Sequence, residues 1–271
     1  MRVQTLRGVF QVVQLLRDAC RKMTTNQRSP IDTVLCAIGA FFFRFRNGLF
    51  PAIFLLVVLL VRPSFFAGEK ELDPFATGFG VAMALLGEIV RCLTIGLVYV
   101  KRGGLNRRVY AKNLVTEGIY AHARNPMYTG NLLIALGFCL MYGSPWMCGV
   151  VFPFFLLVYV GIVFEEERFL REKFGTKYEE YCRNTNRFLP RVRGLAQTMK
   201  QHHFDWKKVV KKEFGTIFGS LFGAYVVLTF KYLYLFGPVG ILGHPVLLSL
   251  FSVPLFILYG TARFLKKTKR L

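Results

Sequence analysis

The sequence predicts an all-α, polytopic membrane protein with about six transmembrane helices and cytoplasmic loops that carry the chemistry. Three observations support this fold class. The 271 residues are 54% apolar, whereas soluble domains are about 45–50% apolar. The apolar residues gather in runs that approach about 20 residues, which is the length that spans a bilayer as a helix. Basic residues gather between alternate runs, as in loops on the cytoplasmic side of a membrane.

The individual spans follow from these runs, and the third has the shortest purely apolar part. Gly143-Ser144-Pro145 predicts a tight turn between the third and fourth spans, which therefore form a hairpin. The first 30 residues are basic and polar, so we expect no cleavable signal peptide. The expected spans are roughly 47–62, 75–100, 126–143, 147–164, 214–236 and 243–263.

Four segments organise the chain around these spans. The first is a basic N-terminal segment, 1–46, whose first 22 residues have the apolar spacing of an amphipathic helix on a membrane surface. A membrane core, 47–190, contains the motifs described below. A basic cytoplasmic connector, 191–213, leads to a C-terminal transmembrane hairpin with a basic tail, 214–271.

The formal net charge of +21 is unevenly distributed. Lysine and arginine crowd 1–46, 101–124, 165–213 and 263–271, whereas the connector 63–74 holds more acidic than basic residues. This alternation predicts an even number of spans with both termini cytoplasmic. The excess charge then reflects topology and attraction to anionic membrane lipids. Because no basic soluble domain is evident, we expect no nucleic-acid partner.

The cysteines and histidines do not predict a metal site. None of the six cysteines has CxxC spacing, and most lie in apolar runs, where a free cysteine behaves as a small hydrophobic residue. His202 and His203 are adjacent and would point apart on a helix. We therefore expect no metal cofactor.

A polar segment opens the third span, with the sequence LVTEGIYAHARNPMYTG from Leu114 to Gly130. Asn125-Pro126 is a strong signal for the start of a helix, with asparagine as the N-cap. The free backbone N–H groups of such a helix can accept a carboxylate. Tyr120 and Tyr128 add aromatic rings beside this helix start.

An acidic cluster, Glu165-Glu166-Glu167, directly follows the fourth span. Because the third and fourth spans form a hairpin, Glu166 and Asn125 should return to the same side of the membrane. Charged groups at such a boundary indicate a site, and carboxylates there can bind a cationic ligand. The next residues predict a short helix leaving the membrane, with a break near Phe174-Gly175.

Together these two blocks resemble the isoprenylcysteine carboxyl methyltransferase and phospholipid methyltransferase superfamily over roughly 75–190. The resemblance rests on a pattern in each block. The first block matches at Leu114-Val115-Thr116, Gly118, Tyr120, Arg124-Asn125-Pro126, Tyr128 and Gly130, and the second at Glu166-Glu167, Leu170, Phe174-Gly175, Tyr178 and Tyr181.

The resemblance implies an integral-membrane methyltransferase that binds S-adenosylmethionine on the cytoplasmic side and takes a lipophilic acceptor from the bilayer. It implies no particular catalytic side chain, since methyl transfer needs mainly alignment and exclusion of water. It places the protein in a plasma or inner membrane in a prokaryote and in the endoplasmic reticulum in a eukaryote. The implied cofactor-binding residues are Lys112, Asn113, Leu114, Val115, Tyr120, Asn125, Pro126, Met127, Tyr128, Glu166 and Glu167.

Two branches of the superfamily remain open. The isoprenylcysteine branch usually has histidine where Asn125 stands, and an arginine in place of the run Gly161-Ile162-Val163-Phe164. The phospholipid amine N-methyltransferase branch has a Gly-x-Gly in an earlier span, for which Gly78-Phe79-Gly80 is a candidate. The FG-x-x-Y-x-x-Y ending instead resembles the carboxyl methyltransferases. A catalytically silent membrane scaffold of the same fold is a further alternative.

Three charged residues lie in the interior of the predicted spans, away from the residues at their ends. Glu88 and Arg91 are three residues apart and predict a pair on one helix face or an element of an acceptor pocket. Lys231 lies nearer the end of a span, and we expect its ammonium group to snorkel to the membrane surface.

Overall fold

The computed structural model describes residues 30–98, 109–242 and 259–260, and these residues form helices joined by short loops. No strand occurs among them, and one isolated bridge joins Ala123 to Asn186. The prediction of an all-α fold is confirmed. The helices are α2 (Pro30–Leu60), α3 (Asp73–Leu97), α4 (Pro126–Tyr142), α5 (Phe152–Phe174), α6 (Thr176–Asn184), α7 (Leu195–Gln201) and α8 (Trp206–Leu242), with short turns at Phe66–Gly68, Gly118–Ala121 and Met147–Val151.

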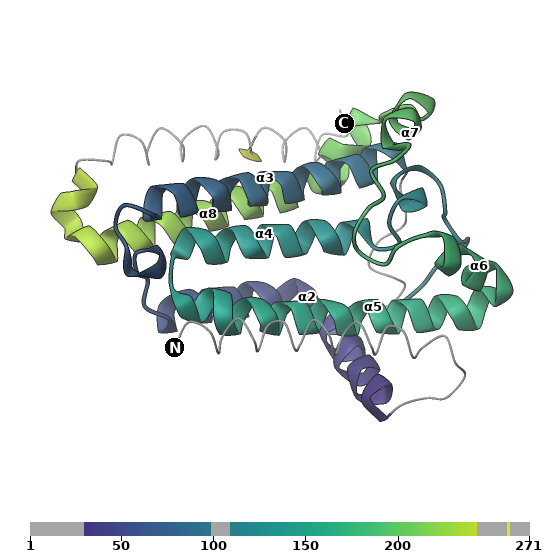
Figure 1. Ribbon diagram of the computed structural model, residues 1–271, viewed down its shortest axis with the longest axis horizontal. Helices are drawn as coiled ribbons and strands as arrows, with labels where there is room; N and C mark the ends of the chain where they lie inside the picture. Colours follow the sequence, from purple (N-terminus) through teal and green to yellow (C-terminus); the bar gives the residue numbers. More distant parts are fainter. Residues whose placement is uncertain (1–29, 99–108, 243–258, 261–271) are drawn as a thin grey trace.

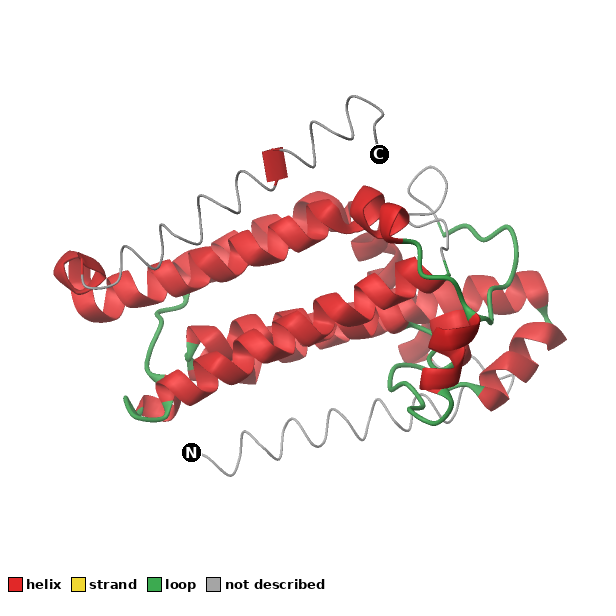
Figure 2. Cartoon of the chain, turned by 90° about the horizontal axis from the view of Figure 1, so that it is seen from above, coloured by secondary structure: helices red, strands yellow, loops and turns green. Residues whose placement is uncertain are grey.

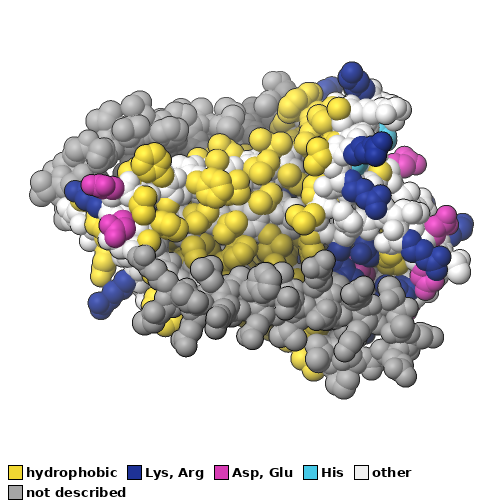
Figure 3. Space-filling view, viewed as in Figure 1, with side chains coloured by type: hydrophobic (Ala, Val, Ile, Leu, Met, Phe, Trp, Pro, Cys, Tyr) yellow, Lys and Arg dark blue, Asp and Glu magenta, His cyan; other side chains and the backbone are white. Residues whose placement is uncertain are grey.

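The long helices lie side by side as a bundle (Figures 1 and 2). The ends of α3 and α5 and the beginnings of α4 and α8 meet at one end, where α6, α7 and the longest loops also gather. We call this the loop end of the bundle. A broad apolar band covers the middle of the visible face, and charged side chains gather at both ends, most densely at the loop end (Figure 3). This distribution is that of a membrane protein.

The prediction of six spans is not confirmed. Within the part of the chain that the structure describes, three helical stretches are long and apolar enough to cross a membrane, namely Asp73–Leu97, Met147–Phe174 and Trp206–Gly237. Helix α2 would add a fourth if its two halves, Val34–Arg46 and Gly48–Leu60, form one span bent by 91°. It begins at Pro30, well before the predicted span. Helix α4 is apolar but only 17 residues long, and most of the predicted sixth span and the N-terminal amphipathic segment lie outside the described residues.

Glycines allow α3 and α4 to pack with their backbones in close contact. A Cβ on Gly87 would lie 2.5 Å from the carbonyl oxygen of Gly130, and one on Gly80 would lie 2.7 Å from that of Gly137. Gly80 and Gly87 are seven residues apart on α3, and Gly130 and Gly137 are seven residues apart on the antiparallel α4. The two glycines of each helix therefore lie on one face of it. Small residues at such contacts are a general device for packing helices in membranes. Gly80 of the Gly78-Phe79-Gly80 motif therefore has a packing role.

The contact between α3 and α4 makes a testable prediction. We expect Gly87→Ala to lower the free energy of unfolding by about 1–3 kcal/mol, because overpacking a tight contact costs about that much. Gly78 lies on the same helix with nothing within 4 Å of a Cβ built on it, so Gly78→Ala should be neutral or stabilising by up to about 1 kcal/mol. Unfolding by SDS titration in mixed micelles measures both variants. Equal effects would contradict the packing role of Gly87.

Helix α8 is attached to α3 by polar side chains along its length. Arg91 and Glu213 form an ion pair of 2.7 Å whose two side chains are almost fully buried, and Ser220 donates a hydrogen bond to Glu88. Lys231 is fully buried, and its Nζ lies 2.7 Å from Asp73 Oδ1. The expectation that Lys231 snorkels is therefore wrong, because a carboxylate on α3 stabilises its charge inside the bundle.

Candidate ligand pocket at the loop end of the bundle

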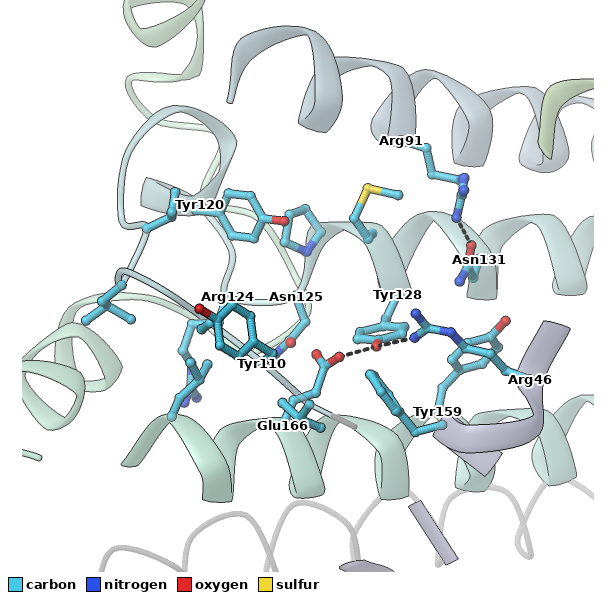
Figure 4. A pocket seen from close by; sticks show the side chains of 18 of the residues that line it. Arg46, Arg91, Tyr110, Tyr120, Arg124, Asn125, Tyr128, Asn131, Tyr159 and Glu166 are labelled. Carbon is cyan, nitrogen blue, oxygen red and sulfur yellow. Dashed lines mark hydrogen bonds between the residues drawn. The ribbon is translucent and has the colours of Figure 1, made fainter. Parts of the chain in front are cut away.

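A cavity of about 660 Å³ opens at the loop end of the bundle. Its walls come from α2, α3, α4, α5, α6, α8 and the loop before α4, so segments far apart in the sequence contribute to it (Figure 4). The side chains at its centre are Tyr128 from α4 and Glu166 from α5. The two sequence blocks that the motif analysis joined therefore meet across this cavity.

The loop before α4 is held in place by the segment that follows α6. The backbone N–H of Arg124 donates to the carbonyl of Asn186 at 2.8 Å, and that of Asn125 donates to Arg187 at 3.1 Å. The Thr129 hydroxyl donates to the carbonyl of Phe188 at 2.9 Å. These three bonds run in parallel order along both segments. The segment 186–188 thus fixes the backbone that carries Asn125.

A chain of hydrogen bonds crosses the centre of the pocket. The Tyr128 hydroxyl donates to Glu166 Oε1 at 2.7 Å, and Arg46 Nη1 donates to the same hydroxyl at 3.3 Å (Figure 4). Tyr159 lies beside Tyr128, with the ring centroids 5.7 Å apart. This chain orients the Glu166 carboxylate at the pocket surface, where it can attract a cationic group.

Glu167 has a different environment, although it is adjacent to Glu166 in the sequence. Its carboxylate is buried and accepts hydrogen bonds from Arg124, Asn125 and Arg187, with the two arginines at 3.2 and 2.9 Å. It therefore connects α5 to the loop before α4 and to the segment after α6. Asn125 occupies the N-cap position of α4, but its side chain makes no capping bond. Its amide bonds to Glu167 instead.

The loop before α4 and helix α6 form one part of the pocket, which we call its outer part. Its lining includes the aromatic side chains of Tyr110, Tyr120, Tyr178 and Tyr181. The Tyr181 hydroxyl donates to the Tyr120 carbonyl at 2.7 Å. Burial raises the pKa of Tyr181, so the phenol stays protonated and keeps this bond through the physiological pH range. The outer pocket is thus a set of ordered aromatic rings that can stack on a planar ligand.

His122 is buried outside the pocket lining. Its Nδ1 lies 2.7 Å from the carbonyl oxygen of Arg191, and its Nε2 lies 2.9 Å from the Thr198 hydroxyl. Both ring nitrogens thus connect the loop to the segment around α7. His122 is neither solvated nor placed to accept a proton from a ligand in the pocket.

Most of the residues that the sequence singled out for cofactor binding line the pocket. Lys112 and Glu167 are the two that the lining does not include; Lys112 is exposed, and Glu167 is held in the ion cluster described above. The residues that do line it are Asn113, Leu114, Val115, Tyr120, Asn125, Pro126, Met127, Tyr128 and Glu166.

Several other lining residues lie outside the motif blocks, and most of them were missed in the sequence analysis. Arg46 comes from α2, Arg91 and Asn131 come from facing turns of α3 and α4, and Lys212 and Thr216 come from the start of α8. Arg91 had a signal in the sequence, where it was expected to pair with Glu88 or to form part of an acceptor pocket. It lines the pocket, and its ion-pair partner is Glu213. Nothing in the local pattern relates Arg46 or Lys212 to the motif blocks.

Among the described residues, no group of three or more His, Cys, Asp or Glu side chains could hold a metal ion. The fold and the pocket together define a helical membrane protein with a polar, aromatic-lined cavity at one end of its bundle.

Comparisons with known proteins agree with the family that the motifs indicated. Residues 76–177 match the phospholipid methyltransferase family. The chain is 32% identical to protein-S-isoprenylcysteine O-methyltransferase B of Arabidopsis thaliana over 47% of this chain and 66% of that protein. It is 30% identical to the A form from the same plant, over 51% of this chain and 70% of that protein. Cobalt-zinc-cadmium resistance protein CzcN of Cupriavidus metallidurans is 31% identical over 58% of this chain and 68% of that protein.

The chain therefore belongs to the isoprenylcysteine carboxyl methyltransferase and phospholipid methyltransferase superfamily. It spans about two thirds of the length of these relatives, and 66% of the first. No solved structure matches the chain significantly. The Arg46, Lys212 and Thr216 side chains lie outside the segment that matches the family.

Proposed function

We propose that this protein is an integral-membrane methyltransferase that transfers a methyl group from S-adenosylmethionine to a lipid or other lipophilic acceptor. The observation that carries the proposal is the meeting of the two motif blocks around one cavity, with the Tyr128–Glu166 hydrogen bond between them. Membership of the superfamily supports the same activity.

The residues of the pocket fit S-adenosylmethionine in size and in chemistry. A cavity of about 660 Å³ lies within the range of about 300–1,000 Å³ that is usual for ligands of this size. Tyr120 and Tyr181 offer aromatic faces to an adenine ring. Leu114 and Val115 offer apolar contacts, and Glu166 offers a carboxylate to the cationic part of the ligand.

S-adenosylmethionine supplies a methyl group bound to a positively charged sulfur, which a nucleophile can displace in line. The chain has to orient this group and exclude water from it. Tyr128 holds Glu166 in one orientation through a bond of 2.7 Å, and Arg46 in turn donates to the Tyr128 hydroxyl. The buried Glu167 cluster keeps Asn125 and the start of α4 fixed in relation to α5. The acceptor would reach the site from the lipid side of the bundle.

The first candidate for this activity is a carboxyl O-methyltransferase, because the chain is similar to protein-S-isoprenylcysteine O-methyltransferases. A phospholipid amine N-methyltransferase is a second candidate, favoured by the match of residues 76–177 to the phospholipid methyltransferase family. Tritiated S-adenosylmethionine separates the two candidates when the purified protein is supplied with phosphatidylethanolamine or with a prenylcysteine. A carboxyl methyl ester releases tritiated methanol in base, whereas an N-methyl group does not. Release or retention of the tritium in base therefore decides between a carboxyl O-methyltransferase and an amine N-methyltransferase.

The binding of S-adenosylmethionine to the full chain in nanodiscs tests the proposal. We expect Glu166→Ala and Tyr128→Ala each to weaken binding at least tenfold, about 1.4 kcal/mol, because the first removes the carboxylate and the second removes the hydroxyl that orients it. Glu165→Ala is the matched control, since Glu165 pairs with Arg168 and does not line the pocket. If folded wild-type protein binds no S-adenosylmethionine, the proposal fails, and a catalytically silent membrane scaffold remains as the alternative function.

A further inference from the structure

An ordered segment at the outside of the loop end exposes large apolar side chains together with cations. It surrounds the short helix α7 and lies outside residues 76–177, which match the family. Six of its side chains form what we call the α7 surface, namely Leu189, Val192, Arg193, Lys200, Trp206 and Lys207. The three apolar ones are 70–77% exposed, and the three cations are exposed as well. Exposed apolar side chains among polar ones mark an interaction site.

Hydrogen bonds hold the backbone of this segment against the bundle. The N–H of Arg191 donates to the carbonyl oxygen of His122 at 3.1 Å, and His122 Nε2 lies 2.9 Å from the Thr198 hydroxyl on α7. Further along the segment, the N–H of Asp205 donates to the carbonyl oxygen of Gly96 at 2.9 Å. The α7 surface is therefore presented by a backbone that is fixed on both sides of α7.

The segment lies at the level where the spanning helices end. Gly96 belongs to the last turn of α3, and a Cβ on it would lie 2.2 Å from the ring of Phe204. Trp206 begins α8 and packs edge-on against Phe204, with the ring centroids 4.5 Å apart. Figure 1 shows α7 beside the end of α3, and Figure 3 shows Lys and Arg side chains next to the apolar band at this end. Tryptophan and cations at such a boundary contact lipid headgroups.

The charge of the α7 surface favours an anionic partner. Asp205 is the one carboxylate in residues 189–208, and its Oδ2 lies 3.2 Å from Lys208 Nζ. The three cations of the α7 surface form no ion pair with any side chain in the described part of the chain. Each lysine or arginine near an anionic bilayer strengthens the attraction about fivefold. Apolar side chains and unpaired cations at the headgroup level therefore suit an anionic lipid surface.

We propose that the α7 surface docks on anionic phospholipid headgroups of the leaflet at the loop end. Leu189, Val192 and Trp206 insert beside the glycerol groups of the lipids, and the three cations contact the headgroups. Segment 186–188 directly precedes this surface and fixes the backbone that carries Asn125, so docking stabilises the loop before α4 from outside. The inference does not depend on the proposed function, since it needs no methyl donor.

Photolabelling of the full chain in phosphatidylcholine nanodiscs tests the docking. Each bilayer carries a trace of one probe, either phosphatidylserine or phosphatidylcholine with the same diazirine near its glycerol group, and mass spectrometry maps the label. We expect the phosphatidylserine probe to label residues 189–207 at least about fivefold more than the phosphatidylcholine probe does. This ratio should fall below about twofold at about 1 M salt, where the Debye length is only about 3 Å.

Two pairs of substitutions separate the α7 surface from the net charge of the loop end. Arg193→Gln combined with Lys200→Gln should reduce the labelling ratio below about twofold, because it removes two of the three cations. Lys177→Gln combined with Arg183→Gln is the matched control, since both residues are exposed on α6 at the same end of the bundle. The control pair removes the same charge and should leave the ratio unchanged.

A third pair tests the apolar part of the surface. Leu189→Ser combined with Val192→Ser should reduce labelling by both probes at least about threefold, because the inserted side chains are lost, whereas the ratio between the probes should persist. Circular dichroism checks that the variants keep their helices.

Equal labelling by the two probes, no label on residues 189–207, or the same loss of ratio in the control pair would overturn the proposal. Cross-linking of these residues to a second copy of the chain, in place of lipid, would also overturn it. Binding of S-adenosylmethionine is measured on the same samples. Its absence would contradict the proposed function and leave the docking in place, whereas loss of the lipid preference with intact binding would contradict the docking alone.

Discussion

Glu167→Ala should lower the free energy of unfolding by about 3–5 kcal/mol, because it leaves buried arginines without their carboxylate. Glu167 is 3% exposed and forms ion pairs with Arg124 and Arg187, while Asn125 donates to its other oxygen. The truncation removes all of these contacts at once. SDS titration in mixed micelles measures the loss, and the circular dichroism of the remaining protein shows whether the helices persist.

Two comparisons separate the role of Glu167 from a general effect of removing charge. Glu172→Ala removes an exposed carboxylate from the same helix and should change stability by less than about 0.5 kcal/mol. Glu166→Ala should weaken binding of S-adenosylmethionine with a much smaller loss of stability, since Glu166 faces the pocket. If the Glu167→Ala and Glu172→Ala variants have the same free energy of unfolding, the contacts of Glu167 with Arg124, Asn125 and Arg187 do not stabilise the loop end.

The different environments of Glu166 and Glu167 show how far the sequence predicts the site. The Asn125-Pro126 signal and the apolar hairpin predict that the two blocks meet, and Asn125 and Glu166 do line one cavity. Successive residues on a helix point about 100° apart, so adjacent glutamates face different surroundings, and here Glu166 alone of the pair lines the cavity. Which one faces inward depends on Arg187, which follows the blocks and approaches only through the chain reversal after α6.

The contribution of α2 and α8 to the pocket was not predictable for a related reason. Arg46 belongs to α2 and Lys212 to α8, and their approach to the pocket depends on the bend in α2 and on where α8 docks. Local apolar runs predict that such helices exist, because burial in lipid needs only length and composition. They do not determine which faces meet. The polar contacts between α3 and α8 determine that, and they join residues more than 120 positions apart.

Lys231→Ala should also lower the free energy of unfolding by about 3–5 kcal/mol, since it leaves Asp73 buried without a cation. Lys231 was expected to snorkel, because a lysine near a span end usually reaches the membrane surface. In the structure its Nζ contacts Asp73 Oδ1 at 2.7 Å, the Met141 carbonyl at 2.8 Å and Thr77 Oγ1 at 3.4 Å. One ammonium group thus connects α8 to α3 and to the end of α4, opposite the loop end.

A double variant distinguishes a paired charge from mere loss of packing. Lys231→Met with Asp73→Asn keeps much of the volume and removes both charges, so it should recover about 2 kcal/mol relative to the sum of the single changes. Lys70→Met is the control, since Lys70 is exposed and its loss should cost less than about 0.5 kcal/mol. Strict additivity of the two buried substitutions would show that Asp73 and Lys231 contribute independently. Recovery would show that Asp73 and Lys231 stabilise the packing of α8 against α3 as a pair, at the end of α8 opposite to Lys212 and Thr216.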